Sequence, residues 1–312
     1  MFVLPTVLAR RKRTAAALLV TGGILAAGAL GPVAAADPVQ LPSLGSAGLS
    51  IPGLGSLMPQ PAATPRLASV ANFRDVAGTD GGYVTTTGRH LQRGVFYRSN
   101  ALTPDAADLK TLEGLHLRAI YDVRTDQEVA QAPDATLPGV KYVHIPILAG
   151  DLYAAAMAVR TPEEAMKFMQ DMNRSFVTDA ANRAGFEQLL TDLANTPGPQ
   201  VFHCTSGKDR TGWASMLLQS VAGVPEATIM KDYLATNDYL AAQNAKTYQS
   251  LVASKGQAAA DALKPMLGVD ASFLQAGLDQ IKTSYGTVDN YLTAGLGLDQ
   301  STLAKLRAKL VR

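Results

Sequence analysis

The 312-residue chain has one cysteine, Cys204, which lies in the segment HCTSGKDRTG at residues 203–212. This segment follows the apolar pair Val201-Phe202 and precedes an apolar stretch with helical character, so we expect it to join a strand to the start of a helix. The first amides of a helix lack carbonyl partners and carry partial positive charge, which suits this place to an anion. A lone cysteine is often an inert core residue, so its neighbours must decide its role.

The neighbours of Cys204 predict a cradle for a phosphate-like dianion. Glycine in the loop allows the backbone angles that such a cradle needs, and one lysine and one arginine add formal positive charge. The residues predicted to bind the phosphate are Thr205, Ser206, Gly207, Lys208 and Thr211. Lys208 is a compact point charge, so it is also a candidate contact for a further phosphate on the substrate.

The same positive field favours the thiolate form of Cys204, which can attack phosphorus. Arg210 can hold two equatorial oxygens with its planar guanidinium while the phosphoryl group moves to sulfur. Thr211 can donate a hydrogen bond to the sulfur and make it a better leaving group in a second step. His203 faces the preceding strand, so we interpret it as a brace for the loop backbone rather than a base.

Other kinds of site do not fit the spacing. A nucleotide-binding P-loop requires G-x-x-x-x-G-K-[ST], and GKDR lacks both the first glycine and a Ser or Thr after the lysine. A zinc site requires more cysteines or paired histidines, whereas the four histidines lie scattered at positions 90, 116, 144 and 203. A Cys–His protease would not explain the Gly-Lys-Asp-Arg-Thr-Gly that completes the segment.

HCTSGKDRTG resembles the HC-x5-R-[ST] signature loop of cysteine-dependent protein tyrosine phosphatases, and its GKDRTG form is similar to that of secreted bacterial tyrosine/lipid phosphatases. The likeness covers most of residues 66–312, through NFRDVAG, GVFYRSNAL, IYDVRTDQE, VKYVHIPI, MKDYLATND and YGTVDNYL. The resemblance implies a phosphocysteine intermediate on Cys204, phosphate held by Arg210 and the loop amides, and no metal or other cofactor. Implied substrates are phosphotyrosine proteins or phosphoinositides, with phosphoserine and phosphothreonine as further possibilities.

The leaving oxygen needs a proton, and two aspartates are candidates for the general acid. The W-P-D loop of animal tyrosine phosphatases is absent, since the one tryptophan, Trp213, follows the signature loop. Asp209 lies inside the loop and is the favoured catalytic acid, although it can instead form an ion pair that shapes the loop. Asp151 follows the predicted strand VHIPI, where related enzymes place an acid on a mobile loop, and is the alternative general acid.

The elements that position this loop are predicted to alternate between strands and helices. Residues 118–124 and 140–147 are β-branched runs predicted to be buried strands. Residues 161–195 are predicted to be helical with a break near Thr178, and the helix after the loop is predicted to end at Gly223. The expected fold is α/β, with a central, mostly parallel sheet flanked by helices, tyrosine-phosphatase-like, and with additional helices as a lid and at the C-terminus.

Several other residues carry a structural and a functional interpretation. The pairs Asp122 with Arg124 and Arg74 with Asp75 are interpreted as ion pairs and loop braces. A methionine-rich helical segment is predicted to pack in the core. The alternative is a mobile lid beside Asp151, because the methionine side chain adapts its packing readily. Its methionines are Met157, Met166, Met169 and Met172.

The N-terminus predicts export. Residues 9–13 are ARRKR, an uncharged apolar stretch follows, and VAAAD provides a cleavage site after Ala36, so residues 1–36 are a predicted signal peptide, with a membrane anchor as the alternative. Residues 37–65 form a Pro/Gly/Ser/Leu-rich spacer whose leucines allow weak contact with an envelope, and residues 66–312 form the predicted phosphatase domain. The expected location is secreted or cell envelope, with no stable membrane span in the mature chain.

The charge of the chain without its predicted signal peptide bears on one class of partner. Without residues 1–36 the chain has 24 basic and 26 acidic residues, a formal charge of −2, which gives no support to a nucleic-acid partner. Two function classes remain, a phosphatase and a catalytically inactive phosphate-binding module. The presence of cysteine, arginine and hydroxyl together favours the enzyme.

Overall fold

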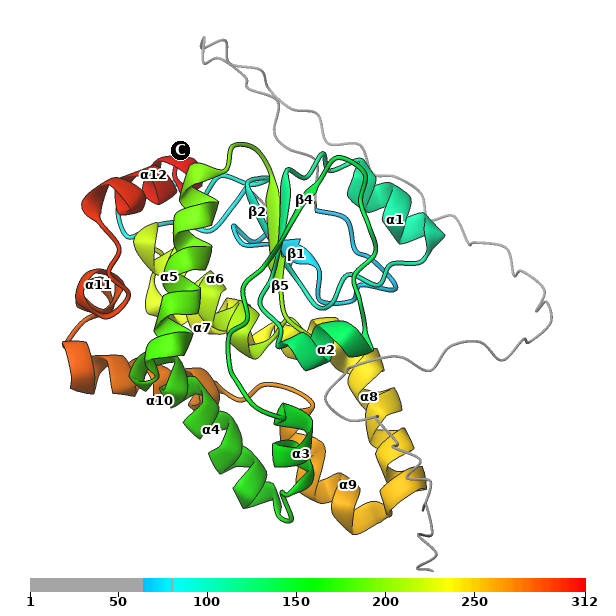
Figure 1. The fold of residues 1–312 in the computed structure, drawn as a ribbon. Helices are drawn as coiled ribbons and strands as arrows, with labels where there is room; N and C mark the ends of the chain where they lie inside the picture. Colours follow the sequence, from blue (N-terminus) through cyan, green and yellow to red (C-terminus); the bar gives the residue numbers. More distant parts are fainter. Residues whose placement is uncertain (1–63, 80) are drawn as a thin grey trace, which may run out of the picture.

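The computed structural model describes residues 64–79 and 81–312 and contains a five-stranded sheet at its centre (Figure 1). The strand order is β1-β2-β5-β3-β4, in which β1 pairs antiparallel with β2 and the other neighbours are parallel. The strands are β1 Arg74–Asp75, β2 Phe96–Ser99, β3 Ala119–Asp122, β4 Lys141–His144 and β5 Gln200–His203. Because parallel strands end at the same edge of a sheet, the residues after β2, β3 and β5 meet there.

Strand β5 is buried on both faces because it lies in the middle of the sheet. Phe202 contributes to the larger hydrophobic core, whereas Val201 on the opposite face joins a smaller one. The larger core contains α5, α6 and α12, and the smaller one contains residues of α1 (Figure 1). Strand β5 is therefore held from both sides directly before Cys204.

One predicted strand differs from expectation in its burial. Strand β4 is one of the two edge strands, pairs only with β3 and has exposed or half-buried side chains, including Tyr142. The prediction that residues 140–147 form a buried strand is wrong on this point. The buried residues of the run, Ile145 and Ile147, follow the strand and pack into the larger core.

The helices flank the sheet and extend beyond it. They are α1 Ala106–Glu113, α2 Asp126–Gln131, α3 Leu152–Met157, α4 Pro162–Thr178, α5 Ala180–Asn195, α6 Asp209–Val221, α7 Glu226–Leu234, α8 Thr236–Lys255, α9 Gln257–Leu263, α10 Ala271–Tyr285, α11 Val288–Asn290 and α12 Gln300–Leu310, with a 3₁₀ turn η1 Lys264–Met266 and a π-helical turn η2 Tyr291–Gly295. The predicted break near Thr178 is confirmed: the Asp179 side chain accepts from the Asn182 amide and begins a new helix.

A layer of helices lies beyond one end of the sheet, in the lower half of Figure 1. It contains α3, α4, α8, α9 and α10, and η1 packs against α4 and α9 within it. The predicted α/β class is thus confirmed, with a mostly parallel central sheet and added helices. The predicted signal peptide, and all but the last two residues of the predicted spacer, lie outside the described residues. No helix within residues 64–79 and 81–312 is long and apolar enough to cross a membrane.

Candidate active site

Cys204 follows the last residue of β5, and α6 begins five residues later at Asp209. The sulfur-bearing residue is buried, and Trp213 on the first turns of α6 is fully buried against Phe176 and Tyr291. The predicted strand–loop–helix is therefore present, with its helix anchored in the larger core.

The backbone carbonyls of the loop are tied to groups behind it. His203 Nδ1 lies 3.3 Å from the carbonyl oxygen of Cys204, and the Ala101 amide donates to that of Thr205 at 3.1 Å. Since the carbonyl and the next amide of a peptide unit point in opposite directions, these contacts turn the amides of residues 205 and 206 toward the other side.

The next two carbonyls are held in the same way. Asn72 Nδ2 donates to the carbonyl oxygens of Ser206 and Gly207, both at 2.9 Å, and Arg98 Nη2 donates to that of Gly207 at 2.9 Å. Among the described residues, no backbone carbonyl accepts a hydrogen bond from the amides of residues 205–208. Four consecutive amides at a helix N-terminus are thus available to an anion.

Gly207 is required for this conformation. Its φ is +68°, and a Cβ added there would lie 2.4 Å from the Ser99 carbonyl oxygen. Any larger residue would be strained in its backbone and would push the loop away from the end of β2.

Arg210 is fixed by an acidic residue that the sequence analysis did not identify. Its Nη1 and Nη2 donate to the two carboxylate oxygens of Glu128 at 2.7 and 2.6 Å. Nη1 also donates to the Val123 and Ile147 carbonyls. Its Nε and the second N–H of Nη2 donate to no acceptor among the described residues, so one edge of the guanidinium stays available for two oxygens of a phosphoryl group.

Glu128 also organises the loop. Burial would raise its pKa, but the charge and hydrogen bonds of Arg210 outweigh burial and lower the pKa to about 2, so the carboxylate is ionised. The Thr205 hydroxyl donates to the same carboxylate, and the Thr125 amide donates to it at 2.9 Å. Thr125 and Glu128 form a capping box at the start of α2. Their spacing is the one feature of the sequence that could have drawn attention to Glu128.

Asp209, the favoured candidate for the general acid, lies at the site. It is buried, lines the cavity beside Cys204, and has Lys208 Nζ 3.7 Å from its carboxylate. Burial raises the pKa of the Asp209 carboxyl, and the charges of Lys208 and Arg210 only partly offset that rise. A carboxyl that holds its proton to higher pH suits the task of a general acid.

Asp151 has a different place. It is exposed, its carboxylate accepts from the Ala154 amide at 2.9 Å, and it caps α3. It is not among the residues that line the cavity, although Leu152 beside it is.

The other predicted phosphate ligands are also near Cys204. Ser206 lines the cavity, and Thr211 Oγ1 is buried without a hydrogen-bond partner among the described residues, as a hydroxyl that serves the sulfur would be. Lys208 Nζ donates to the Met266 carbonyl and, at 3.0 Å, to that of Gly268. Lys208 therefore joins the loop to the end of η1 and to the residues that follow it.

A cavity of about 100 Å³ lies over the loop, beneath the helical layer. Besides the loop, Asn244 and Thr247 are its polar lining residues, and the remainder is apolar. The apolar residues are Leu152, Ala156, Met157, Phe168, Met169, Met172, Leu263, Met266 and Leu267. Three of the four predicted methionines thus cover the site, whereas Met166 packs against the larger core.

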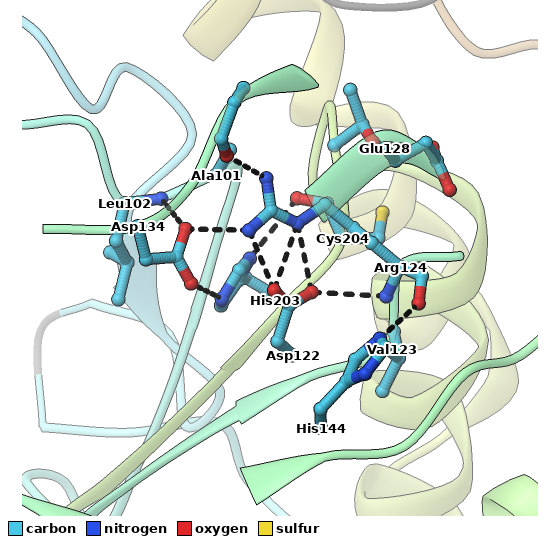
Figure 2. Close-up of polar contacts among 12 residues, drawn as sticks. Ala101, Leu102, Asp122, Val123, Arg124, Glu128, Asp134, His144, His203 and Cys204 are labelled. Carbon is cyan, nitrogen blue, oxygen red and sulfur yellow. Dashed lines mark hydrogen bonds and ion pairs between the residues drawn. The ribbon is translucent and has the colours of Figure 1, made fainter. Parts of the chain in front are cut away.

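A group of metal-ligand type lies behind the loop, formed by Asp122, Asp134 and His203. Figure 2 shows that the Arg124 guanidinium lies among them and donates to both carboxylates. The ion pair of Asp122 and Arg124 was predicted and is confirmed, with Nη2 at 2.6 Å from Oδ2. Arg124 supplies the positive charge that a metal would otherwise bring.

Arg74 does brace the loop region, but its partner differs from the one predicted. It pairs with Asp232 of α7 at 3.3 Å, as does Arg98 at 3.0 Å, while Asp75 accepts from the amides of Ala77 and Gly94. The two arginines therefore connect α7 to the residues that hold the loop carbonyls.

Comparisons with known proteins identify the family of the chain. The chain belongs to the tyrosine phosphatase family, whose model matches residues 65–312. It is 34% identical over 205 residues to a candidate tyrosine-protein phosphatase of Cupriavidus necator. The aligned region covers 64% of this chain and 71% of that protein. It is 29% identical over 202 residues to the triple specificity protein phosphatase PtpB of Mycobacterium tuberculosis. That aligned region covers 56% of this chain and 70% of the mycobacterial protein.

A solved structure of TpbA from P. aeruginosa in complex with phosphotyrosine also aligns, with a TM-score of 0.25 and 17% identity over 57% of this chain and 89% of that chain. The family match and the curated relatives confirm the resemblance of HCTSGKDRTG to the signature loop of tyrosine phosphatases. The chain is a phosphatase of the tyrosine phosphatase family.

Proposed function

We propose that the chain is a secreted protein tyrosine phosphatase that hydrolyses phosphomonoesters through a phosphocysteine intermediate on Cys204. One observation carries this proposal: the carbonyls of residues 204–207 are all tied back, so the amides of residues 205–208 and the free edge of Arg210 surround one anion site beside the only thiol. Such a site fits a phosphoryl group better than a carboxyl or a neutral group.

In the first step, the Cys204 thiolate attacks phosphorus while the P–O bond to the leaving group breaks. The loop amides and Arg210 stabilise the charge on the three equatorial oxygens. Asp209, protonated at the start, gives its proton to the leaving oxygen, so the products are a free alcohol or phenol and phosphocysteine.

In the second step, water attacks phosphorus and the P–S bond breaks. The Asp209 carboxylate accepts a proton from the water, and the Thr211 hydroxyl donates to the departing sulfur. Inorganic phosphate leaves, and both the thiolate and protonated Asp209 are restored.

The acid role of Asp209 predicts a dependence on the leaving group. Asp209→Asn is expected to lower kcat on an alkyl phosphate by about 10²-fold and to have little effect on an aryl phosphate with an acidic leaving group. Because Asp209 acts as an acid only below its raised pKa, alkyl phosphate turnover should fall as pH rises through that value. The asparagine variant should lose this fall, which a pH series on both substrates measures.

Asp151→Asn is the matched control, since Asp151 is an exposed carboxylate that caps α3. If Asp151→Asn shows the loss on alkyl phosphate and Asp209→Asn does not, the acid is Asp151.

Activity on phosphoinositides and on phosphoserine or phosphothreonine belongs to the same proposal, supported by the similarity to a phosphatase named for triple specificity. Lys208 was the predicted contact for a further phosphate. Its Nζ donates to the Met266 and Gly268 carbonyls, however, which supports a structural role instead.

We therefore expect Lys208→Ala to reduce kcat/KM on a phosphotyrosine peptide and on a phosphoinositide by similar factors, because the substitution releases the segment after η1 in both cases. Steady-state kinetics on the two substrates measures this ratio. A much larger loss on the phosphoinositide alone would return Lys208 to the direct phosphate contact. Lys264→Ala is the control, because Lys264 lies on η1, the 3₁₀ turn that also contains Met266.

The N-terminal assignments are also proposed: a signal peptide at 1–36, a spacer at 37–65 and the phosphatase domain at 66–312. Mass spectrometry of chain recovered from culture medium tests the first, with Asp37 expected as the first residue. Chain retained with the cells and starting upstream of Asp37 would contradict export by cleavage.

The function itself is tested by phosphate release from a panel of phosphotyrosine, phosphoserine and phosphothreonine peptides and phosphoinositides. The phosphotyrosine peptides are expected to be hydrolysed without added metal, and chelation is expected to leave the rate unchanged. No phosphate release from any member of the panel would overturn the proposal.

A further inference from the structure

Four charged or titratable side chains are buried together behind the phosphate loop, as Figure 2 shows. They are Asp122, Arg124, Asp134 and His203, and none exposes more than 4% of its side chain. Arg124 Nη2 lies 2.6 Å from Asp122 and 2.9 Å from Asp134. His203, the residue before the nucleophile, completes the cluster.

Both ring nitrogens of His203 lie close to oxygen atoms. Nε2 lies 2.7 Å from Asp134 Oδ2 in an ion-pair contact that lacks the alignment of a hydrogen bond, and Nδ1 lies 3.3 Å from the carbonyl oxygen of Cys204. A carbonyl oxygen can only accept, and so can a carboxylate. A ring nitrogen without a proton would turn its lone pair toward an oxygen lone pair in either contact, so the contacts favour a proton on each nitrogen, which is the imidazolium form.

The charges in the cluster lead to the same conclusion. Asp122 and Asp134 carry two negative charges and Arg124 carries one positive charge, while the Tyr142 hydroxyl donates to Asp122 at 2.8 Å without adding charge. With a neutral His203, a net negative charge would remain buried beneath a loop that binds anions. An imidazolium makes the cluster neutral, which avoids the cost of an unpaired buried charge.

We propose that Asp134 is a positioning residue that holds His203 as an imidazolium, so that a fixed positive charge lies behind Cys204 and the phosphate loop. The groups that face His203 are the carboxylates of Asp122 and Asp134, the Arg124 guanidinium and Cys204 itself. Burial lowers the pKa of His203, but the two carboxylates outweigh burial and raise it.

Asp134 is suited to this role by its other contacts. It lies in the connection between α2 and β4, and its Oδ1 accepts from the Leu102 amide at 3.0 Å as well as from Arg124. It therefore links the segment after β2, the segment after β3 and the end of β5 at one point. Its effect reaches the substrate only through His203.

The fixed charge has a consequence for the nucleophile. A positive charge beside a thiol favours the thiolate, so loss of the imidazolium should shift thiolate formation to higher pH. The catalytic meaning of this shift rests on the proposed role of Cys204, whereas the protonation state of His203 can be measured without turnover.

The first test is a ¹⁵N NMR titration of the histidines in the unaltered chain. His203 is expected to keep two protonated ring nitrogens at neutral pH and above, whereas a free histidine loses one near pH ~6.5. A His203 ring with a single protonated nitrogen at neutral pH would overturn the proposal, whatever the enzyme activity.

The second test is Asp134→Asn, which keeps the size of the side chain and removes its charge. The midpoint of the pH dependence of Cys204 alkylation by iodoacetamide is expected to move up by about one pH unit. The histidine spectrum of the variant should show His203 with one proton at neutral pH, and Asp134→Glu should restore both readouts in part.

Asp126→Asn is the matched control, because Asp126 is an exposed carboxylate 3.7 Å from the ring of His144. It is expected to leave the alkylation midpoint unchanged, since solvent screens that charge. A folded Asp134→Asn variant with an unchanged midpoint would contradict the proposal. If Asp134→Asn does not fold, the titration of the unaltered chain decides alone.

Discussion

Cys204→Ser is expected to lower turnover of an aryl phosphate by at least ~10⁴-fold, because serine offers a hydroxyl where the reaction needs an ionised nucleophile. Binding of inorganic phosphate should remain, since the amides of residues 205–208 and Arg210 do not depend on the sulfur for their positions. Phosphate release and isothermal titration calorimetry measure the two effects separately.

Lost turnover with retained phosphate binding distinguishes the loss of the nucleophile from misfolding of the variant. Ser215→Ala is a suitable control, because Ser215 lies on the same helix and its hydroxyl donates only to the Thr211 carbonyl. Substantial turnover in Cys204→Ser would remove the covalent mechanism, and loss of phosphate binding together with turnover would show that the loop had collapsed.

Arg210→Lys is expected to reduce kcat by about 10³-fold, even though it preserves the charge. The guanidinium uses two N–H groups on Glu128 and keeps another edge for the phosphoryl oxygens. An ammonium cannot make both bidentate contacts, so the lysine variant also leaves the buried Glu128 carboxylate poorly paired. Steady-state kinetics and thermal unfolding of the variant measure the two consequences.

Arg174→Lys is the matched control, since Arg174 pairs with Asp171 on the exposed side of α4. We expect this exposed exchange to leave both kcat and the unfolding temperature nearly unchanged. Activity of Arg210→Lys close to that of the parent chain would mean that the guanidinium geometry has no part in the reaction.

Local sequence signals predicted those parts of the fold that depend on neighbouring residues. The strand, loop and helix around Cys204 follow from an apolar pair, a glycine-containing loop and an apolar helical run. The helix break at Asp179 follows from one capping side chain. The burial of β4 could not be predicted in this way, because it depends on which strand lies at the edge of the sheet.

The residues that hold the loop were missed for a similar reason. Asn72, Arg98 and Asp232 are separated from the loop by up to 135 residues of sequence, and no spacing connects them. Glu128 had a sequence signal as a helix cap, but that signal says nothing of the arginine that it holds. Such contacts are set by tertiary packing.

Lys208 and Asp209 illustrate the limit at the level of single residues. They are neighbours in the sequence and both line the cavity, yet Lys208 Nζ reaches the backbone of residues 266 and 268, while Asp209 is buried beside the loop. Residue type alone could not predict that Lys208 contacts the helical layer above the loop, whereas Asp209 lies where it can take part in the reaction.

The central claim is that the phosphoryl group passes through Cys204. It is tested most directly by quenching the chain in acid during turnover of an aryl phosphate and mapping the peptides by mass spectrometry. The account predicts one added phosphoryl group on the peptide that contains Cys204, present only with substrate and absent in Cys204→Ser. Turnover at the normal rate with no phosphoryl group on Cys204, or with the group on another residue, would contradict it.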